Sequence, residues 1–406
     1  MANHKRVVYG GVDTHQDTHV AAALDAQGRL LGTQAFPTSP LGLTALHVWL
    51  AGHGQIECVG VEGTGSYGAG LTRTLHAAGV RVVEVNRPNR QLRRARGKSD
   101  PIDAEAAARA ALGGQASATP KTRDGIVEAI RVLKVALDGT RKQMTQLAER
   151  IHHLLLTAPD PLRTQLGGLT KTQRITRCAG LRPGTDLTDP VRATKHALRT
   201  LAGQYQHLAG DHRDLTTQLD TLTRTANPAL RAAYGVGPDT AAALLVTAGD
   251  NPHRLTSEAG FAALCGASPI PASSGKTQAM RLNRGGNRHA NAALHRIVLV
   301  RLAHDPTTQH YRDRRTSELS TTAAVQRCLK RYVAREMYRL LTNPPPVLPT
   351  NDLRDLRTTS GLTQTAIAHH LNTTPAVISR IERGKTYDPH LITAYRHLLQ
   401  QAKPAA

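Results

Sequence analysis

Short apolar runs alternate with polar turns over the first 112 residues of the 406-residue chain. The run RVVYGGVD at 6–13 and the run HVAAALD at 19–25 have the length and the turn boundaries of β-strands. The same pattern predicts further strands at 30–36, 56–63 and 81–86, and helices at 41–54, at 67–79 and from Asp100 onwards. Three strands followed by alternating helices and strands predict a mixed α/β sheet.

Between 124 and 225 the apolar residues are spaced alternately four and three apart, which is the spacing of a coiled-coil seam. This pattern predicts a helical arm that pairs subunits, with a second helix in similar register between Tyr205 and Leu222. A helix packed on its own domain is the alternative, although such a helix favours a wider apolar stripe. The seam consists of Ile126, Ile130, Leu133, Leu137, Thr140, Met144, Leu147, Ile151 and Leu154.

Changes in composition divide the chain into domains. A helix cannot cross the proline-rich segment NPPPVLPTND, which therefore separates a small C-terminal module from the rest. We expect a mixed-sheet domain at 1–120, the helical arm at 121–226, a mostly helical domain at 227–342, a proline-rich linker at 343–351 and a small helical domain at 352–403.

Lysine and arginine outnumber aspartate and glutamate by 52 to 30, which gives a formal net charge of +22. Such an excess indicates a polyanionic partner, most often nucleic acid. Aromatic residues make up only 3%, which favours phosphate contacts over base stacking. The rival, a basic membrane-surface protein, needs a lipid anchor or an amphipathic helix rich in lysine and large apolar residues, and the sequence offers neither. Four widely spaced cysteines argue against a zinc or disulfide framework, and neither a signal peptide nor a membrane span is found, so we expect a cytoplasmic protein.

Two carboxylates three residues apart, Asp100 and Asp103, begin a predicted helix directly after a run of arginines. One interpretation makes Asp100 the N-cap and Asp103 the acid of a capping-box-like start. Asp13 and Glu62, however, end the first and fourth predicted strands, where side chains gather at one edge of the sheet. Four acids clustered there repel one another unless they bind divalent cations such as Mg²⁺ or Mn²⁺. Two such ions make a site that cuts phosphodiesters.

A strongly basic run precedes the helix-borne acids. It is interpreted either as a strip that tracks phosphates beside the acids or as a solvated run of charges. The candidate phosphate-binding residues in it are Arg87, Arg90, Arg93, Arg94, Arg96 and Lys98.

The order of these motifs resembles the DEDD-type transposases of insertion sequences. The resemblance is carried by GVDTH after the first strand, GVEGTGSYG after the fourth strand and KSDPIDA at the helix start. It implies a RuvC-like domain of the RNase H-like fold, and a catalytic tetrad that holds two Mg²⁺ ions, for which Mn²⁺ can substitute. The implied metal-binding tetrad is Asp13, Glu62, Asp100 and Asp103.

A second block supports the same family. LRAAYGVGPDTAAALLVTAGD predicts two helices around a GVG turn, as in helix-hairpin-helix elements that hold a phosphate, although an ordinary glycine turn fits equally well. The following GASPIPASSGKTQAMRLNRGGNRHA resembles the C-terminal transposase domain of the family. Without that resemblance PASSGKT is a flexible loop, and its GKT lacks the first glycine of a P-loop.

The resemblance implies that a serine in this loop attacks the DNA phosphate and becomes covalently linked to the DNA. We assign this role to Ser274, which directly precedes Gly275, with Ser273 as the alternative. A serine hydroxyl is a weak nucleophile and needs a base, a metal or strong electrostatic activation. The residues expected to stabilise charge on the phosphate are Lys276, Arg281, Arg284 and Arg288.

The C-terminal module follows the pattern of a repressor-type helix-turn-helix, with a generic helical hairpin as the alternative. Gln364 and Thr374 are expected to contact phosphate, and the groove-facing residues are expected to be Ala376, Val377 and Arg380. Pro375 occupies a position where such proteins often place a hydrogen-bonding side chain, which predicts weak base readout. Members of the family usually end before such a module. Three ligands of the module therefore stay possible: the end of the insertion element, the promoter of the element and the RNA.

The sequence is therefore identified as a member of a family of site-specific DNA recombinases that transpose insertion sequences. The family implies donor and target DNA as partners and a guiding bridge RNA. The coiled-coil arm predicts a homo-oligomer, a dimer or a tetramer, and we expect it in the bacterial cytosol close to the nucleoid. Two alternatives stay open. One is a metal-dependent nuclease of the junction-resolvase type in which water attacks, and the other is a non-enzymatic DNA-binding regulator.

Overall fold

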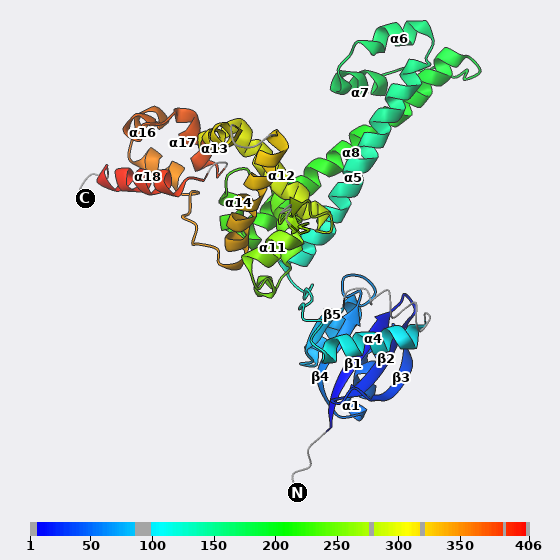
Figure 1. The fold of residues 1–406 in the computed structure, drawn as a ribbon. Helices are drawn as coiled ribbons and strands as arrows, with labels where there is room; N and C mark the ends of the chain where they lie inside the picture. The colour runs from blue at the N-terminus through cyan, green and yellow to red at the C-terminus, as the bar shows by residue number, and fades with distance from the viewer. Residues whose placement is uncertain (1–5, 86–98, 276–279, 317–320, 385–386, 403–406) are drawn as a thin grey trace. The chain divides into compact units, whose positions relative to one another are not determined.

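The computed structural model describes residues 6–85, 99–275, 280–316, 321–384 and 387–402 (Figure 1). The chain forms two compact units. The first unit contains residues 1–128 and 248–256, and the second contains residues 129–247 and 257–406. Across these described residues, no helix combines the length and the apolar character that a membrane crossing requires.

A five-stranded mixed sheet forms the centre of the first unit, in the order β3-β2-β1-β4-β5. β1 pairs antiparallel with β2 and parallel with β4, β2 pairs antiparallel with β3, and β4 pairs parallel with β5. The predicted mixed α/β sheet is confirmed. The strands are β1 (Val7–Thr14), β2 (Thr18–Asp25), β3 (Leu30–Pro37), β4 (Gln55–Glu62) and β5 (Val82–Val85).

Helices cover both faces of this sheet. Neighbouring residues of a strand point to opposite faces. A Cβ built on Gly10 meets Leu50 of α1 (Pro40–Gly52), whereas a Cβ on Gly11 meets the backbone of α4 (Asp100–Leu112). The α1 face also carries α2 (Ala69–Ala77), and together these elements bury the main apolar core of the unit. Figure 1 shows α4 lying across β1, β2 and β4 on the other face.

The backbone of α4 packs directly on the sheet. A Cβ on Gly11 would stand 2.0 Å from the amide nitrogen of Ala108, and one on Gly60 would stand 2.5 Å from the carbonyl oxygen of Ala107. The buried face of the helix is made of alanines together with Asp103. Glycine on the strands and alanine on the helix thus allow α4 to approach the ends of β1 and β4 closely.

A later part of the chain returns to the first unit. The Asn251 side-chain amide donates to the carbonyl of Pro120 at 3.0 Å, and the carboxylate of Asp250 accepts from the amide of Val127 at 2.7 Å. Arg254, in the short 3₁₀ helix η1 (Pro252–Arg254), donates to the carbonyl of Thr119 at 2.8 Å. These hydrogen bonds give partners to backbone carbonyl and amide groups of the extended segment that follows α4.

The second unit begins with a long helical arm. α5 (Ile126–Leu156) and α8 (Pro190–Ala226) lie side by side, and α6 (Asp160–Gly167) and α7 (Lys171–Ala179) connect them at the far end (Figure 1). Seam residue Ile151 packs with Leu198 and Ala202 of α8. At this end the predicted seam packs on a helix of its own chain, and pairing between subunits stays a prediction.

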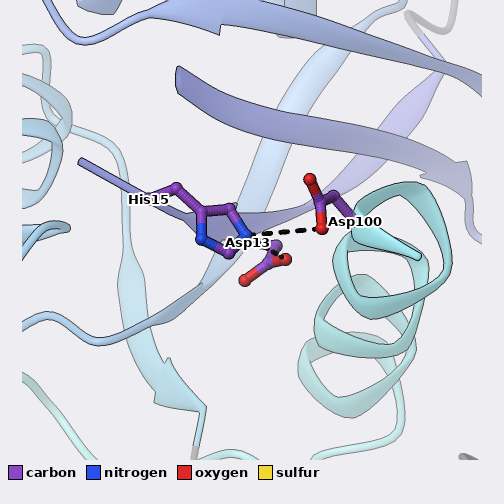
Figure 2. A group of neighbouring side chains, drawn as sticks. All are labelled: Asp13, His15 and Asp100. Carbon is purple, nitrogen blue, oxygen red and sulfur yellow. Dashed lines mark hydrogen bonds and ion pairs between the residues drawn. The ribbon is translucent and has the colours of Figure 1, made fainter. Parts of the chain in front are cut away.

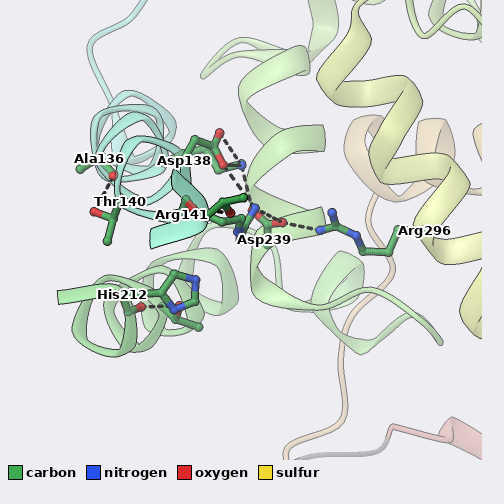
Figure 3. A network of polar contacts seen from close by, with 10 residues as sticks. Ala136, Asp138, Thr140, Arg141, His212, Asp239 and Arg296 are labelled. Carbon is green, nitrogen blue, oxygen red and sulfur yellow. Dashed lines mark hydrogen bonds and ion pairs between the residues drawn. The ribbon is translucent and has the colours of Figure 1, made fainter. Parts of the chain in front are cut away.

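The mostly helical domain of the second unit starts with the predicted pair of helices around the GVG turn. Asp239, in the first turn of α10, pairs with Lys134 of α5 at 2.8 Å, with Arg141 at 3.5 Å and with Arg296 of α12 (Figure 3). Burial alone would raise the pKa of Asp239, but these cations lower it to about 2. Asp239 thus links α10 to α5 and α12, and phosphate binding at the GVG turn stays a prediction. The helices are α9 (Pro228–Ala232), α10 (Pro238–Ala248), α11 (Glu258–Leu264), α12 (Arg288–His304), α13 (Pro306–Thr316) and α14 (Thr322–Thr342), and a short hairpin joins β6 (Ile270–Pro271) to β7 (Met280–Arg281).

The C-terminal module is a bundle of short helices around its own core. Glu382 is buried in this core, where it accepts from Arg357 at 2.6 Å, from the hydroxyl of Tyr395 at 2.7 Å and from the side-chain amide of Gln364 at 2.7 Å. The predicted helix-turn-helix architecture is confirmed. Its helices are α15 (Leu353–Thr359), α16 (Gln364–His370), α17 (Pro375–Glu382) and α18 (Pro389–Gln401).

Adding one methyl group at the contact between α4 and the sheet should destabilise the first unit. Gly11→Ala forces the helix away from β1, and overpacking of this kind costs about 1–3 kcal/mol. Because Trp49 on α1 is the one tryptophan of the sequence, its fluorescence reports urea unfolding of this unit alone. We expect the urea midpoint of Gly11→Ala to fall by about 1 M.

Gly52→Ala is the matched control for this substitution. Gly52 ends α1 in the same unit, and a Cβ there would meet nothing within 4 Å. Its urea midpoint should stay unchanged or rise slightly, because alanine favours helix more than glycine does. Equal midpoints for Gly11→Ala and Gly52→Ala would contradict the proposed packing constraint.

Candidate functional site

Three potential metal ligands meet at the end of β1 (Figure 2). Nε2 of His15 lies 3.1 Å from Oδ2 of Asp13 and 3.4 Å from Oδ1 of Asp100, and the ligand atoms of all three lie within 4.8 Å of one another. Asp13 comes from the strand, His15 from the turn after it and Asp100 from the first residue of α4. The predicted convergence of a strand acid and a helix acid therefore occurs.

Burial makes the ionised form of Asp13 costly. The residue is 6% exposed, and burial raises the pKa of its carboxyl group. His15 opposes that rise by its charge and hydrogen bond, whereas the charges of Asp103 and Asp100 add to it. Asp103 is itself 2% exposed, in the first turn of α4. A bound cation would offset this repulsion, so the donor set fits a divalent metal ion.

Glu62 ends the strand next to β1. Val61 pairs with Val12 across the parallel strands, so Glu62 lies at the same edge as Asp13. The Thr14 hydroxyl donates to the backbone carbonyl of Glu62 at 2.8 Å and ties the two strand ends together. Within the described residues, the three-ligand cluster does not include the carboxylates of Glu62 and Asp103. Their role as ligands stays a prediction.

The interpretation of Asp100 as a helix cap is wrong. The helix begins at Asp100, and its N-cap residue is Ser99, whose side chain makes no capping hydrogen bond. Both acids lie in the first helical turn, three residues apart and therefore on one face. The first turn of α4 therefore presents two acids on one face, and Asp100 pairs there with His15.

His15 is the site residue that the sequence analysis missed. It lies in the turn, one residue beyond the end of β1 and two positions after Asp13. A histidine, which is a common metal ligand, so close to the predicted ligand Asp13 in GVDTH is the signal that could have identified it. His19 lies close by on β2, opposite Thr14, with 1% of its surface exposed. Burial lowers its pKa, which favours a neutral imidazole.

The predicted nucleophile lies in the second unit. Ser274 is exposed and follows β6 by three residues, and Gly275 after it has a φ of 54°. Arg281 on β7, Arg284 and Arg288 at the start of α12 are also exposed.

Asparagines and glycines hold the basic segment after the hairpin in place. The Asn291 side-chain amide donates to the carbonyl of Cys265 at 2.8 Å, and the Asn287 backbone amide donates to the carbonyl of Leu264 at 2.6 Å. A Cβ on Gly286 would stand 2.3 Å from the amide nitrogen of Gly266. The segment therefore lies against the end of α11 with its arginines exposed.

Comparison with known proteins places these elements in one family. Residues 10–158 match the family model of the DEDD transposases of IS110 elements, and residues 227–313 match the transposase model of the IS116/IS110/IS902 family. The two models together span more than half of the sequence. The chain belongs to the IS110 family of transposases. Residues 351–395 separately match a helix-turn-helix domain.

A curated relative of this IS110-family chain comes from Streptomyces coelicolor A3(2) and is described as "Insertion element IS110 uncharacterized 43.6 kDa protein". The two sequences are 31% identical over 156 residues. The alignment spans 37% of this chain and 37% of the relative.

In the helix-turn-helix of this IS110-family chain, Ala376 and Arg380 are exposed on α17, whereas Val377 is partly buried against the core of the module. Gln364 donates to the buried Glu382, and Thr374 is the N-cap residue of α17 without a side-chain capping bond. Two further sets of predicted contacts, Lys276 and the strip of Arg87, Arg90, Arg93, Arg94, Arg96 and Lys98, lie outside the described residues.

Asp13→Asn should stabilise the metal-free chain while abolishing its stabilisation by metal. In the folded chain the pKa of Asp13 is raised, so the folded state keeps a proton that the unfolded state has lost. Stability is therefore lost as pH rises through the folded pKa, and asparagine removes this loss. In EDTA at neutral pH, the urea midpoint of Trp49 fluorescence should be higher in Asp13→Asn than in the wild type.

Added Mn²⁺ should reverse that order. Wild type should gain about 2.7 kcal/mol at a Mn²⁺ concentration 100 times its Kd, whereas Asp13→Asn gains little. Asp17→Asn is the control, because Asp17 is exposed in the turn after His15 and outside the cluster. Equal Mn²⁺ stabilisation of wild type and Asp13→Asn would refute a metal site at Asp13.

Proposed function

We propose that this chain is a site-specific DNA transposase that cuts and rejoins DNA strands through a covalent phosphoserine intermediate. The observation that carries the proposal is the cluster of Asp13, His15 and Asp100 at the edge of an IS110-type DEDD domain. The transposase match over 227–313, which contains Ser274, supports the serine chemistry.

The acids of the first unit are the proposed metal-binding residues. Asp13 and Asp100, with Asp103 and Glu62 beside them, would hold two divalent ions, Mg²⁺ or Mn²⁺, and His15 would supply an additional nitrogen ligand. Such ions activate an attacking oxygen and stabilise a leaving one. The first turn of α4 favours acids there, because the N-terminus of a helix carries partial positive charge.

Ser274 is the proposed nucleophile for strand exchange. Its Oγ forms a bond to the DNA phosphorus as the sugar oxygen leaves with a proton, and the released strand end later reverses this step on a new partner. The phosphodiester bond energy is conserved in the serine ester, so no nucleotide hydrolysis is required. Arg281, Arg284 and Arg288 are the proposed donors to the phosphate in the transition state.

Guidance by a bridge RNA and assembly as a dimer or tetramer belong to the same proposal. The net charge of +22 supports long contacts with nucleic-acid backbones. The apolar positions Val132 and Val135 on α5, 53% and 62% exposed, support a helical arm that contacts a second subunit. Sequencing of nucleic acid that co-purifies with the chain tests the RNA directly.

Ser274→Ala should abolish a covalent link between protein and DNA. With radiolabelled DNA carrying the element end, wild type should give a protein–DNA band that survives denaturation, and Ser274→Ala should lower its yield about 10³-fold or more, because it removes the attacking oxygen. Ser273→Ala is the control and should keep the band.

The two alternatives give different results in that assay. Cutting by Ser274→Ala without any adduct in wild type would favour a nuclease that uses water. Retention of every activity in Asp13→Asn, combined with loss of function on removal of 352–400, would favour a regulator. A band that is lost in Ser273→Ala and kept in Ser274→Ala would identify Ser273 as the nucleophile.

Arg380→Ala should weaken binding of duplex DNA by the helix-turn-helix. Arg380 is exposed on α17, the helix proposed to enter the major groove, and loss of a base or phosphate contact there costs about tenfold in affinity. The exposed Arg354 on α15 is the charge-matched control. Titration of duplex DNA from the element end, at two salt concentrations, should show the loss for Arg380→Ala alone. Equal losses for both substitutions would indicate a nonspecific charge effect.

A further inference from the structure

A cavity of about 650 Å³ lies at the foot of the hairpin that carries Ser274. Pro269 before β6 and Met280 and Arg281 of β7 form one wall, and α13 and α14 supply the other. The cavity belongs wholly to the second unit and contains none of the acids of the metal cluster. Its volume falls in the range of small-ligand sites, roughly 300–1,000 Å³.

Two tyrosines give this cavity an aromatic wall in a chain that is poor in aromatic residues. The rings of Tyr311 and Tyr332 lie 5.7 Å apart at an angle of 77°. Arg314 stands 5.7 Å from the centre of the Tyr311 ring, whereas Tyr332 keeps 54% of its surface exposed. An exposed ring that is fixed by a perpendicular neighbour is a surface on which a planar base can stack.

The charged residues that line the cavity all have one sign. Six are cationic and none is acidic, and Arg281 and Arg327 have no carboxylate partner among the residues that the structure describes. The cationic residues are Arg281, Arg315, Arg327, Lys330, Arg331 and Arg335. Glu258 neutralises part of this charge from outside, since it pairs with Arg331 at 2.9 Å and with Arg335 at 3.1 Å. The remaining positive charge complements a phosphate.

Hydrogen bonds connect Lys330, which lines the cavity on α14, to Asn291 of α12 and to the segment at Cys265 and Gly266. Lys330 donates to the side-chain oxygen of Asn291 at 3.1 Å, and Asn291 donates to the carbonyls of Cys265 at 2.8 Å and Gly266 at 3.2 Å. Gly266 has a φ of 63°, and a Cβ there would stand 3.2 Å from the Asn291 amide nitrogen. The cavity is therefore formed without a ligand, which lowers the ordering cost of binding.

The chain length from the cavity to Ser274 is short. Ser274 follows Pro269, which lines the cavity, by five residues, and these span at most about 17 Å when extended. Successive phosphates of one DNA strand rise by about 3.4 Å per base along the duplex axis. A nucleotide in the cavity would thus lie within a few positions of a phosphate that contacts Ser274.

We propose that this cavity binds one unstacked nucleotide of a DNA single strand next to the phosphate that Ser274 attacks. The base stacks on Tyr332, and Arg281 and Arg327 bind the flanking phosphates. The inference deepens the proposed function and rests on it for the role of Ser274. It assigns to the C-terminal transposase domain a pocket that selects strands already opened at the cutting site, because a paired base is not free to enter.

Fluorescence of 2-aminopurine tests this pocket without any catalytic step. The probe is a short single-stranded oligothymidylate with one 2-aminopurine, titrated with the full chain in EDTA. Stacking on an aromatic side chain is worth about a tenfold change in affinity on removal of the ring. Tyr332→Ala should weaken binding about tenfold and reduce the change in fluorescence, whereas Tyr332→Phe, which keeps the ring, should bind like wild type.

A charge substitution provides a second test of the pocket and does not disturb its packing. Arg327→Gln should weaken binding of the probe and lower its salt dependence, because Arg327 is exposed. Arg163→Gln, an exposed arginine of α6 in the arm, is the matched control and should leave both unchanged. Unchanged affinity for Tyr332→Ala and Arg327→Gln, or tighter binding of the matching oligoribonucleotide, would overturn the assignment to a DNA strand.

The test separates failure of the pocket from failure of the proposed function. Probe binding in EDTA requires neither the metal cluster nor strand cleavage, because neither the acids of the cluster nor Ser274 line the cavity. Normal probe binding without any protein–DNA adduct would reject the serine mechanism and keep the pocket. An adduct that forms normally in Tyr332→Ala, together with unchanged probe binding, would reject the pocket and keep the mechanism.

Discussion

The contact of one helix backbone with two glycines is the constraint on which the acidic site depends. Gly11 and Gly60 lie on adjacent parallel strands, and α4 presses on both with alanines at the contact. Larger residues on either side would lift the helix and carry Asp100 and Asp103 away from the end of β1. The distance between strand acid and helix acids is therefore set by backbone packing, which varies far less than the conformation of long side chains.

Much of the first unit could be predicted because its strands are short apolar runs bounded by turns, and the ends of β1 and β4 then identify Asp13 and Glu62 as neighbours. His15 was missed because it lies in the turn, where periodicity gives no orientation and the bond to Asp13 decides where the ring points. The helical arm could likewise be predicted only in part. Spacing identified the seam on α5, but only the return of the chain through α6 and α7 shows that α8 covers part of it.

The basic motif before α12 divides into two roles that the sequence could not separate. Asn287, Asn291 and Gly286 pack against the end of α11 through bonds to backbone carbonyls and a close glycine contact. Their partners lie twenty or more residues earlier, so no local pattern reveals them. Arg284 and Arg288 of the same motif are exposed and keep their charge available. An asparagine in such a motif is therefore better explained by the fold, and an arginine by a ligand.

The acids are arranged so that the site can form before a cation arrives. Asp100 and Asp103 occupy the first turn of α4, where unpaired backbone amides and the helix dipole favour negative charge, and His15 bridges Asp13 and Asp100. Asp13 lies at the end of a strand, away from a helix N-terminus, and burial raises the pKa of its carboxyl group. A site of this kind gives up some stability of the empty protein and needs little rearrangement on binding. Ser274, in contrast, is exposed on a hairpin, so activation of its hydroxyl in the proposed mechanism would depend on groups that the bound nucleic acid brings beside it.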